Sequence, residues 1–441
     1  MPEVDVEEFG LPRSRAANER LHALVPGGAH TYAKGCDQYP ENLAPVISHG
    51  RGAHVWDVDG NRYVEYGSGL RSVSLGHAHP RVNEAVHREI DRGVSFARPS
   101  VVEARAAERF LATVPTAEMV KFAKNGSDVT TAAVRLARAV TGRARVAVCG
   151  DHPFFSADDW FVATTPMSAG IPAAVAELTV SFPYGDLAAT EDLLTRYAGE
   201  VACLVLEPGE PAPGYLEGLR ALADRHGCVL VFDEMITGLR WSEAGAQGLY
   251  GVVPDLSTFG KALGNGFAVS ALAGRRELME RGGLRHPGER VFLLSTTHGA
   301  ETHALAAAMA VQSTYTEEGV TARLHAIGDR LAAGVRAAAA GAGVGGHVVV
   351  RGRASNLVFA TLDERGRPSQ EYRTLFLRHL LANGVLAPSF VVSSALTDAD
   401  VDRTVEAVAG ACTVYRKALD AGDPTPWTGG RPVRPVFRSR A

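Results

Sequence analysis

Short apolar runs alternate with segments of helical periodicity through the middle of the chain. Seven such runs, rich in β-branched and aliphatic residues, fall between about residues 119 and 300: MVKFA, ARVAVC, LTVSF, VACLVLE, CVLVFDE, DLSTFG and VSALAG. Near-continuous apolar strands with helices between them are typical of a parallel sheet whose two faces are both covered. The pattern predicts an α/β fold with a mostly parallel seven-stranded sheet.

The flanking regions predict shorter elements. Periodicity and stop signals indicate a hairpin over 54–66 and helices over 13–24, 80–90, 100–113 and 302–340, with short strands and two further helices after them. The chain is too long for one ordinary core. We expect an N-terminal segment that joins the small domain (1–60), a large domain (61–310) and a small α+β domain that ends in an arm (311–441).

Composition narrows the class of protein. With 46% hydrophobic and 21% charged residues, the chain has an ordinary globular composition. A net charge of −4 gives no argument for nucleic acid or an anionic membrane, and no apolar run approaches the ~18 residues of a membrane span. Five scattered cysteines without a CxxC motif, and an acidic N-terminus without the pattern of a secretory signal, favour the cytoplasm.

Polar residues directly follow four of the predicted strands. They are Asn125-Gly126-Ser127, Glu207-Pro208, Asp233-Glu234 and Lys261. Active sites of parallel sheets lie beyond the carboxyl ends of the strands. The sequence therefore predicts that these segments converge on one site.

Asp233 and Lys261 indicate the chemistry of that site. A carboxylate at the end of a buried strand costs several kcal/mol without a partner, and a lysine among small apolar residues is a candidate for desolvation, which makes its amine nucleophilic. An acid that holds a pyridinium nitrogen and a lysine that forms an imine are the equipment of a pyridoxal-phosphate site. The alternatives are a helix cap or an Arg240 partner for Asp233, and an ordinary exposed lysine.

Gly126 and Ser127 stand directly before a segment of helical spacing. Free N–H groups at a helix start, together with a serine hydroxyl, form an anion site that suits a phosphate. The alternative is that Ser127 or Asp128 merely caps the helix.

Two other motifs give weaker evidence for a functional site. GAGVGG, at 341–346, matches the dinucleotide-binding pattern but follows a helix and precedes a strand, the reverse of the required order, so we expect a turn. His77 and His79 lack a third ligand at a suitable spacing, which disfavours a metal site.

Motifs along most of the chain resemble the class III (fold type I) pyridoxal-phosphate aminotransferases, and within them the glutamate-semialdehyde aminomutases. The resemblance runs from about residue 20 to 410, and its most specific carriers are DEMITGLR (233–240) and PDLSTFGKALGNG (254–266). Further carriers are PGGAHTYAKG, WDVDGNRYVEY, GHAHPRV, NGSDVTTAAVRLAR, LEP and STTHGAE. The resemblance implies pyridoxal 5'-phosphate as the cofactor and the fold type I architecture.

The resemblance also implies roles for residues around the cofactor. Lys261 matches the lysine that forms the Schiff base and moves the substrate proton, and Asp233 matches the acid that keeps the ring nitrogen protonated. Met235 matches a side chain packed under the ring, and Glu207 a glutamate near the cofactor hydroxyl.

The phosphate end of the cofactor is matched separately. Gly126 and Ser127 match the phosphate cup, and Asp128 stands where the family usually has threonine. Thr296 matches a threonine that reaches the phosphate from the other subunit, which implies a homodimer with shared active sites.

Other positions depart from the family pattern. The aromatic residue that stacks on the ring is replaced within Asp151-His152-Pro153, so stacking comes from His152, Phe154 or Phe155, or is absent. The segment 153–173 resembles the gating loop of the mutase in length and in Gly-Ile-Pro.

The substrate pocket of the mutase is altered most. Thr31 and Lys34 replace the serine and arginine that hold the substrate carboxylate, and Leu70, followed by Arg71, replaces a pocket tryptophan. Lysine cannot make the planar two-point grip of arginine. Lys34 and Arg71 suggest a substrate with a carboxylate, a phosphate or hydroxyls, although both residues could instead be surface charges.

The combined interpretation is an aminotransferase. It moves an amino group from an amino-acid donor to the aldehyde or ketone of a small polar biosynthetic intermediate through a Lys261 Schiff base. The competing hypotheses are an intramolecular 2,1-aminomutase of the glutamate-semialdehyde type, a racemase or epimerase of the same fold, and a non-catalytic binding protein.

Overall fold

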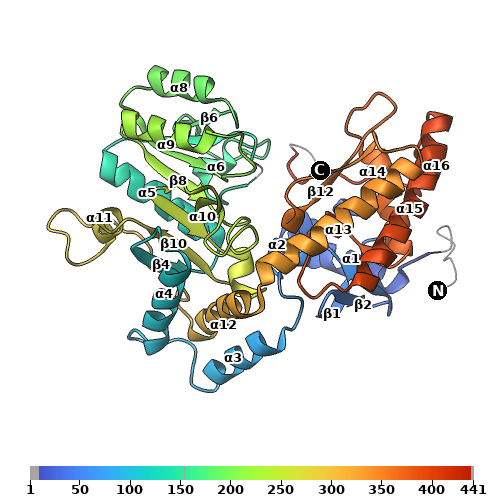
Figure 1. The fold of residues 1–441 in the computed structure, drawn as a ribbon, viewed down its shortest axis with the longest axis horizontal. Coiled ribbons are helices and arrows are strands. Elements are labelled where there is room, and N and C mark those ends of the chain that lie inside the picture. Colours follow the sequence, from blue (N-terminus) through green and yellow to red (C-terminus); the bar gives the residue numbers. More distant parts are fainter. Residues whose placement is uncertain (1–8, 153, 439–441) are drawn as a thin grey trace. The chain divides into compact units, whose positions relative to one another are not determined.

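The computed structural model describes residues 9–152 and 154–438, and its internal contacts divide the chain into two units (Figure 1). The central unit is Pro80–Thr321. The terminal unit joins both ends of the chain, the residues up to His79 and Ala322–Arg438.

These boundaries differ from the expected ones at 60/61 and 310/311. The difference at the N-terminal side arises because Gly52 and His77 exchange backbone hydrogen bonds of 2.8 and 2.9 Å, which ties the chain up to His79 to the preceding hairpin. At the other side, α12 (Thr302–Glu318) packs against α3 (Pro80–Ile90) and α4 (Val101–Thr113) and so belongs to the central unit.

The centre of the central unit is a seven-stranded sheet with the order β4-β10-β9-β8-β7-β5-β6. Its strands are β4 (Met119–Ala123), β5 (Arg145–Cys149), β6 (Thr179–Phe182), β7 (Val201–Leu206), β8 (Val229–Asp233), β9 (Leu256–Phe259) and β10 (Ser270–Gly274). Only β10 runs antiparallel to its neighbours. The mostly parallel sheet and all seven predicted strands are confirmed.

Apolar residues cover both faces of this sheet. Along β7, Val205 belongs to one buried cluster, with residues of α5 (Gly126–Thr141), whereas Leu204 and Leu206 belong to another, with residues of α9 (Tyr215–His226). Burial on both faces explains why these strands read as continuous apolar runs rather than as alternating ones.

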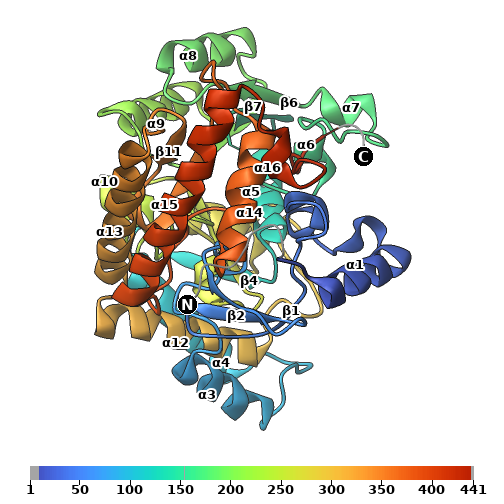
Figure 2. The same ribbon diagram turned by 90° about the vertical axis from the view of Figure 1, so that its right-hand side faces the viewer.

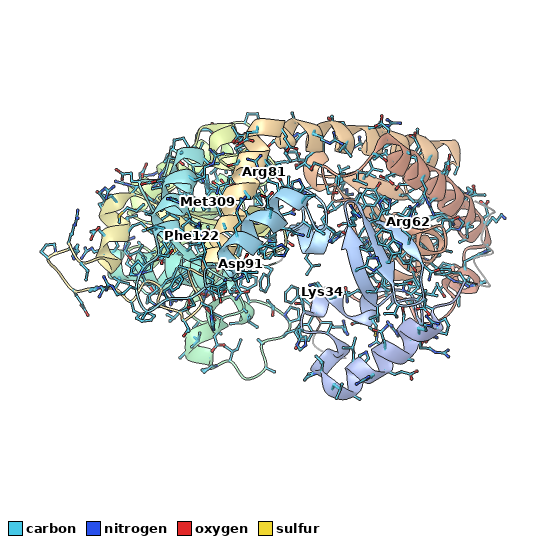
Figure 3. All side chains as sticks on the ribbon, turned by 90° about the horizontal axis from the view of Figure 1, so that it is seen from below. Lys34, Arg62, Arg81, Asp91, Phe122 and Met309 are labelled. Atoms are coloured by element: carbon cyan, nitrogen blue, oxygen red, sulfur yellow. The ribbon has the colours of Figure 1, made fainter. Side chains whose placement is uncertain are left out.

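Helices α3, α4 and α12 form one group in the central unit (Figures 1 and 3). Figure 3 marks Arg81 on α3, Met309 on α12 and Phe122 on β4. The remaining short helices of the unit are α6 (Asp159–Val162), α7 (Ala173–Ala176), α8 (Leu187–Arg196), α10 (Ala246–Tyr250) and α11 (Arg276–Met279).

The terminal unit contains a small sheet and long helices. Its strands are β1 (Ile47–Arg51), β2 (His54–Asp57), β3 (Arg62–Glu65) and β13 (Val385–Leu386), in that order, and a separate pair, β11 (Val348–Arg351) and β12 (Val358–Thr361). Its helices are α1 (Pro12–Leu24), α2 (Ser68–Arg71), α14 (Gln370–Ala382), α15 (Asp398–Ala421) and α16 (Thr425–Thr428), together with most of α13 (Val320–Gly341). Helices α14 and α15 pack against each other (Figure 2).

The glycine-rich stretch 341–346 forms the turn between α13 and β11, as its order of elements predicts. Among the described residues, no helix combines the length and apolarity that crossing a membrane requires.

The contact between α13 and the loop before β12 requires a glycine. A Cβ on Gly328 would overlap the backbone carbonyl of Ala354, which cannot move aside as a flexible side chain could. We expect Gly328→Ala to lower the free energy of unfolding by about 3 kcal/mol, since overpacking against fixed backbone is costly. Gly341→Ala, at the end of the same helix and facing open space, is the matched control and should leave stability unchanged or slightly raised. Thermal unfolding of both variants tests this, and equal midpoints would contradict it.

Candidate active site

The carboxyl ends of β4, β5, β7, β8 and β9 lie at the same edge of the central sheet, because these strands are parallel. The register pairs Leu206 with Phe232 and Asp233 with Thr258, so Glu207, Asp233 and the segment leading to Lys261 follow neighbouring positions. Ser270, at the start of β10, reaches the same edge, where its hydroxyl donates to the Asn125 carbonyl at 2.8 Å. The edge therefore gathers the segments that the sequence singles out.

Asp233 is a buried acid at the end of β8. Its side chain is 3% exposed, and Oδ1 accepts the Met235 N–H at 2.9 Å. Burial raises the pKa of Asp233 to about 6, against the opposing charge of Lys261 and the Met235 hydrogen bond. No helix begins at Asp233, since the next one is α10, so the helix-cap alternative for this residue is wrong.

Lys261 follows β9 in a strained conformation. Its φ is +45°, a left-handed value that costs about 1–3 kcal/mol for a residue with a Cβ. Its neighbours Gly260, Ala262 and Leu263 are buried, whereas Lys261 itself keeps partial exposure. Strain of this kind persists only where the surrounding structure enforces it, and it concentrates at functional sites.

Met235 joins three of the segments. It is 6% exposed, and a Cβ on Gly260 would lie 2.7 Å from its Sδ, while a Cβ on Gly126 would lie 3.1 Å from the same atom. The two glycines thus allow Met235 to pack between the start of α5 and the residue before Lys261. Close approach, rather than turn geometry, explains the glycine at both positions.

The start of α5 contains a capping box. Asp128 Oδ2 accepts the N–H groups of Asn125 at 2.8 Å and Lys124 at 3.3 Å. The Asp128 carboxylate therefore caps the helix, the alternative that the sequence left open, and its negative charge would oppose a phosphate ligand. Ser127 Oγ accepts the Ala157 N–H at 2.9 Å, so its hydroxyl proton stays available to an anion. In the first turn the Asp128 N–H donates to the Asn125 carbonyl at 3.2 Å, so the N–H groups of Gly126 and Ser127 are the candidates to hold an anion.

His152 follows β5 and forms a hydrogen bond with the residue that follows β7. Its Nδ1 accepts the Glu207 N–H at 3.2 Å, and its ring contacts those of Phe155 and Tyr184 at 5.8 and 5.3 Å between centroids. Burial lowers the pKa of His152 to about 4, so the imidazole is neutral and carries its proton on Nε2.

The other two candidates for ring stacking are placed differently. Phe155 is 3% exposed and belongs to the core of the unit, and Phe154 is half exposed and meets Phe161 edge-on. Pro153 lies outside the described residues. Of the three candidate aromatic rings, only His152 is partly exposed and also held by contacts from two other strand ends.

Two residues at this edge have roles that sequence reasoning missed. Glu234 is fully buried and accepts the N–H groups of Ala246 and Gln247 at 2.7 and 2.8 Å, and burial raises its pKa to about 7. It organises the start of α10. Tyr184 donates its hydroxyl to the Pro208 carbonyl, which braces the loop after β7. For Glu234, the acidic pair at the end of an apolar run could have indicated a buried role. No sequence pattern pointed to Tyr184.

Thr296 lies in an exposed segment beside β4. With Lys121, Phe122 and Glu103 it lines a cavity of about 260 Å³. Gly299 donates its N–H to the Thr296 carbonyl at 3.3 Å, which closes a turn around this residue.

The four residues expected to contact the substrate all belong to the terminal unit. Thr31 and Lys34 are exposed and share one turn, in which the Lys34 N–H donates to the Thr31 carbonyl at 2.8 Å. Leu70 and Arg71 lie in a left-handed turn, with φ of +61° and +73°. Arg71 Nε donates to Asn356 Oδ1 at 2.9 Å, so part of its guanidinium serves the fold.

A family model described as Aminotransferase class-III matches residues 37–392. Glutamate-1-semialdehyde 2,1-aminomutase of Syntrophobacter fumaroxidans is 34% identical over 429 residues, covering 90% of this chain and 97% of that protein. An omega-transaminase from Sphaerobacter thermophilus superposes with a TM-score of 0.82 at 27% identity, covering 93% and 99% of the two chains. The FumI protein of Sphingopyxis sp. MTA144, solved in its PLP internal aldimine form, superposes with a TM-score of 0.85 at 25% identity, covering 94% and 99%.

The burial of Asp233 should make this residue unfavourable for stability. Its folded pKa of about 6 lies above the ordinary 3.8, so the folded chain binds more protons between these values and loses stability as the pH rises through them. We expect Asp233→Asn to stabilise the cofactor-free protein by about 3 kcal/mol at pH 7.5 and by only about 1 kcal/mol at pH 4.5. Thermal unfolding at both pH values measures the difference. A difference independent of pH would show that the carboxylate is not the cause.

Proposed function

Because the chain belongs to the class III aminotransferases, we propose that it transfers an amino group from an amino-acid donor to the aldehyde or ketone of a small polar biosynthetic intermediate. The donor carbon is oxidised to a keto acid and the acceptor carbonyl carbon is reduced to an amine. The cofactor of this family is pyridoxal 5'-phosphate, which when bound acts as an electron sink for the substrate carbon.

The residues at the sheet edge fit this cofactor. Asp233 is a buried acid with a raised pKa, and a pyridinium N–H would supply the positive partner that favours its ionised form. The N–H groups at the start of α5, with the Ser127 hydroxyl, would hold the phosphate. Asp128 acts through the helix cap in this proposal and does not contact the phosphate.

The observation that carries the proposal is the position of Lys261 relative to Asp233. Asp233 ends β8 and Lys261 follows the adjacent parallel strand β9, within reach of one ligand, and the positive charge of Lys261 acts on the Asp233 carboxyl. The Nζ amine of Lys261 would form the bond to the cofactor and would then move the proton at the substrate carbon. The strained backbone of Lys261 and its apolar neighbours orient this amine and limit water around it.

Three further side chains complete the proposed cofactor pocket. Met235 would pack under the ring, held there by the space at Gly126 and Gly260. His152 would stack over the ring as a neutral imidazole, supported by its contacts to Glu207 and Tyr184. Glu207 would orient the hydroxyl of the ring.

A second copy of the chain completes the site in this proposal. Thr296 is exposed beside the edge strand β4, in a segment that lines a cavity of about 260 Å³. In a homodimer it would donate its hydroxyl to the phosphate held by the partner, as the family resemblance implies.

Acceptor recognition is proposed for the terminal unit. Lys34 is exposed and makes no ion pair with any residue in 9–152 or 154–438, so its charge is available to an anionic group. Thr31 shares its turn, and Leu70 and Arg71 present a second short surface held by the left-handed turn. An acceptor with a carboxylate or phosphate suits these side chains best.

The competing function is an intramolecular 2,1-aminomutase. It is favoured by the 34% identity to the aminomutase of Syntrophobacter fumaroxidans. Against it stand Thr31, Lys34 and Leu70, which replace the groups that bind the mutase substrate in the resembling family. A point charge and a leucine at these positions weaken the recognition of that particular substrate.

A donor alone should complete half of the transferase reaction. We expect the visible absorbance of the cofactor to change within one turnover when an amino-acid donor is added, with one equivalent of keto acid released per site. Absorbance spectroscopy with keto-acid quantification over a donor panel checks this. Lys261→Ala is the control, and it should abolish turnover by at least about 10⁴-fold.

Other outcomes of this experiment identify the alternatives. Turnover of an amino aldehyde or diamine without any donor-dependent keto acid would establish the mutase instead. Solvent-proton exchange at the substrate carbon without net transfer would indicate a racemase or epimerase. Borohydride reduction that leaves Lys261 unlabelled would overturn the assignment of this lysine.

The charge of Lys34 should matter only for an anionic acceptor. We expect Lys34→Gln to raise KM for such an acceptor about tenfold, the loss of one charge-assisted hydrogen bond, and to leave KM for a neutral acceptor unchanged. Arg62→Gln, an exposed cation on β3 of the same unit, is the matched control (Figure 3). Equal KM changes for both acceptors would exclude a direct contact.

A further inference from the structure

The last described residues of the chain, Gly429–Arg438, form a strap along Cys36–Glu41. This C-terminal strap lies beyond residue 392, where the family model ends. Four hydrogen bonds join the two segments: Arg434 N–H to the Asp37 carbonyl (3.0 Å), Gln38 Nε2 to the Arg434 carbonyl (3.0 Å), Arg431 N–H to Glu41 Oε2 (2.8 Å) and an Arg438–Asp37 ion pair (2.5 Å).

The strap is itself fixed to the terminal unit. Val433 is 3% exposed, and its N–H donates to Thr374 Oγ1 on α14 at 2.9 Å. Thr428, just before the strap, is also buried, and its Oγ1 lies 3.0 Å from the carbonyls of both Thr425 and Gly430, so its single proton can be donated to either. The strap therefore links Cys36–Glu41 to α14 through hydrogen bonds.

The segment that the strap holds has little regular structure of its own. Residues 26–41 contain only three single turns, Pro26–Gly28, Tyr32–Lys34 and Cys36–Gln38, whose backbone bonds close locally. Such turns do not locate a segment relative to the rest of the unit. Besides the strap, two contacts anchor the segment. Tyr39, five residues after Lys34, packs against a buried cluster that includes Leu43 and Tyr63, and His22 Nε2 lies 3.1 Å from Cys36 Sγ. Because Lys34 lies two residues before Cys36, the strap influences its position.

The strap also changes the charge around Lys34. Residues 26–41 carry one lysine and two acids, Asp37 and Glu41, whereas Gly429–Arg438 carries three arginines and no acid. The strap engages both acids directly, Asp37 through Arg438 and Glu41 through the Arg431 N–H. Without it, these carboxylates would repel an anion that approaches Lys34.

We propose that the C-terminal strap is a positioning element for acceptor recognition. It holds the Thr31–Lys34 turn in place and offsets the charges of Asp37 and Glu41, so that the surface selects anionic acceptors. Arg438 and Asp37 are positioning residues that act through Lys34. This proposal rests on the proposed role of Lys34 in the aminotransferase reaction.

The rate of cleavage by endoproteinase Lys-C after Lys34 measures how firmly this segment is held, independently of enzyme activity. The chain has five lysines, and Lys34 and Lys417 are both exposed, Lys417 within the regular helix α15. In the full-length holoenzyme, Arg438→Ala should speed cleavage after Lys34 about fivefold to tenfold, because proteolysis follows the population of the released segment, and should leave cleavage after Lys417 unchanged. Mass spectrometry of the fragments gives both rates.

Steady-state kinetics with an anionic acceptor measures the consequence for recognition. Arg438→Ala should raise KM about fivefold and change kcat less than twofold, and Arg438→Lys should restore most of the loss. Asp37→Asn breaks the same ion pair and should speed cleavage after Lys34 to a similar extent. It should raise KM less than Arg438→Ala does, because it also removes the carboxylate that repels the anion, and the double variant should behave like Asp37→Asn. Arg416→Ala, which breaks the exposed Arg416–Asp420 pair on α15, is the matched control and should change neither cleavage nor KM.

An unchanged KM in Arg438→Ala would overturn the proposal, whatever the cleavage rate. Unchanged cleavage after Lys34 would overturn it as well, because the segment would then be held without the strap. Failure of the proposed function would be seen separately, as a wild-type enzyme that releases no keto acid from any donor.

Discussion

Burial of the Asp233 carboxyl at the carboxyl edge of the central sheet is the constraint on which the rest of the site depends. Within the chain, its hydrogen bond from Met235 and the charge of Lys261 do not offset the desolvation, and the pKa stays raised at about 6. A protein that keeps such a group gives up stability at neutral pH. In the proposed function, binding of the cofactor ring would stabilise the ionised Asp233 carboxylate and so offset part of the desolvation cost. The apoenzyme and holoenzyme should therefore differ in stability as well as in activity.

The geometry around Asp233 follows from strand direction and close packing. Five parallel strands end at one edge, and each is followed by a residue or segment of the proposed site. A side chain at Gly260 would require Met235 to shift, and one at Gly126 would crowd it. Backbone from three separate segments is thereby held around one thioether, which fixes their mutual positions more closely than the sheet register alone.

The proposed residues for cofactor binding and for acceptor recognition belong to different units of the chain. The proposed cofactor residues belong to the central unit, and the proposed acceptor residues belong to the terminal unit, whose two sequence halves are joined by the β3–β13 pairing and by the C-terminal strap. Acceptor recognition can therefore vary through the chain ends while the cofactor site is kept. The replacements at Thr31, Lys34 and Leu70 fit this pattern.

The sequence by itself determined the seven strands, the mostly parallel character of their sheet and the polar residues at their ends, because continuous apolar runs between helices are compatible with few other folds. That β10 is the antiparallel strand came from the structure. Tertiary structure alone decided what those polar residues do. Asp128 caps a helix, Glu234 organises a loop and His152 bridges two strand ends, since each role depends on backbone N–H groups distant in sequence or set by local geometry. The same holds for Cys36–Glu41 and Gly429–Arg438: they lie about 390 residues apart, and no periodicity predicts a contact that charge and a few hydrogen bonds create.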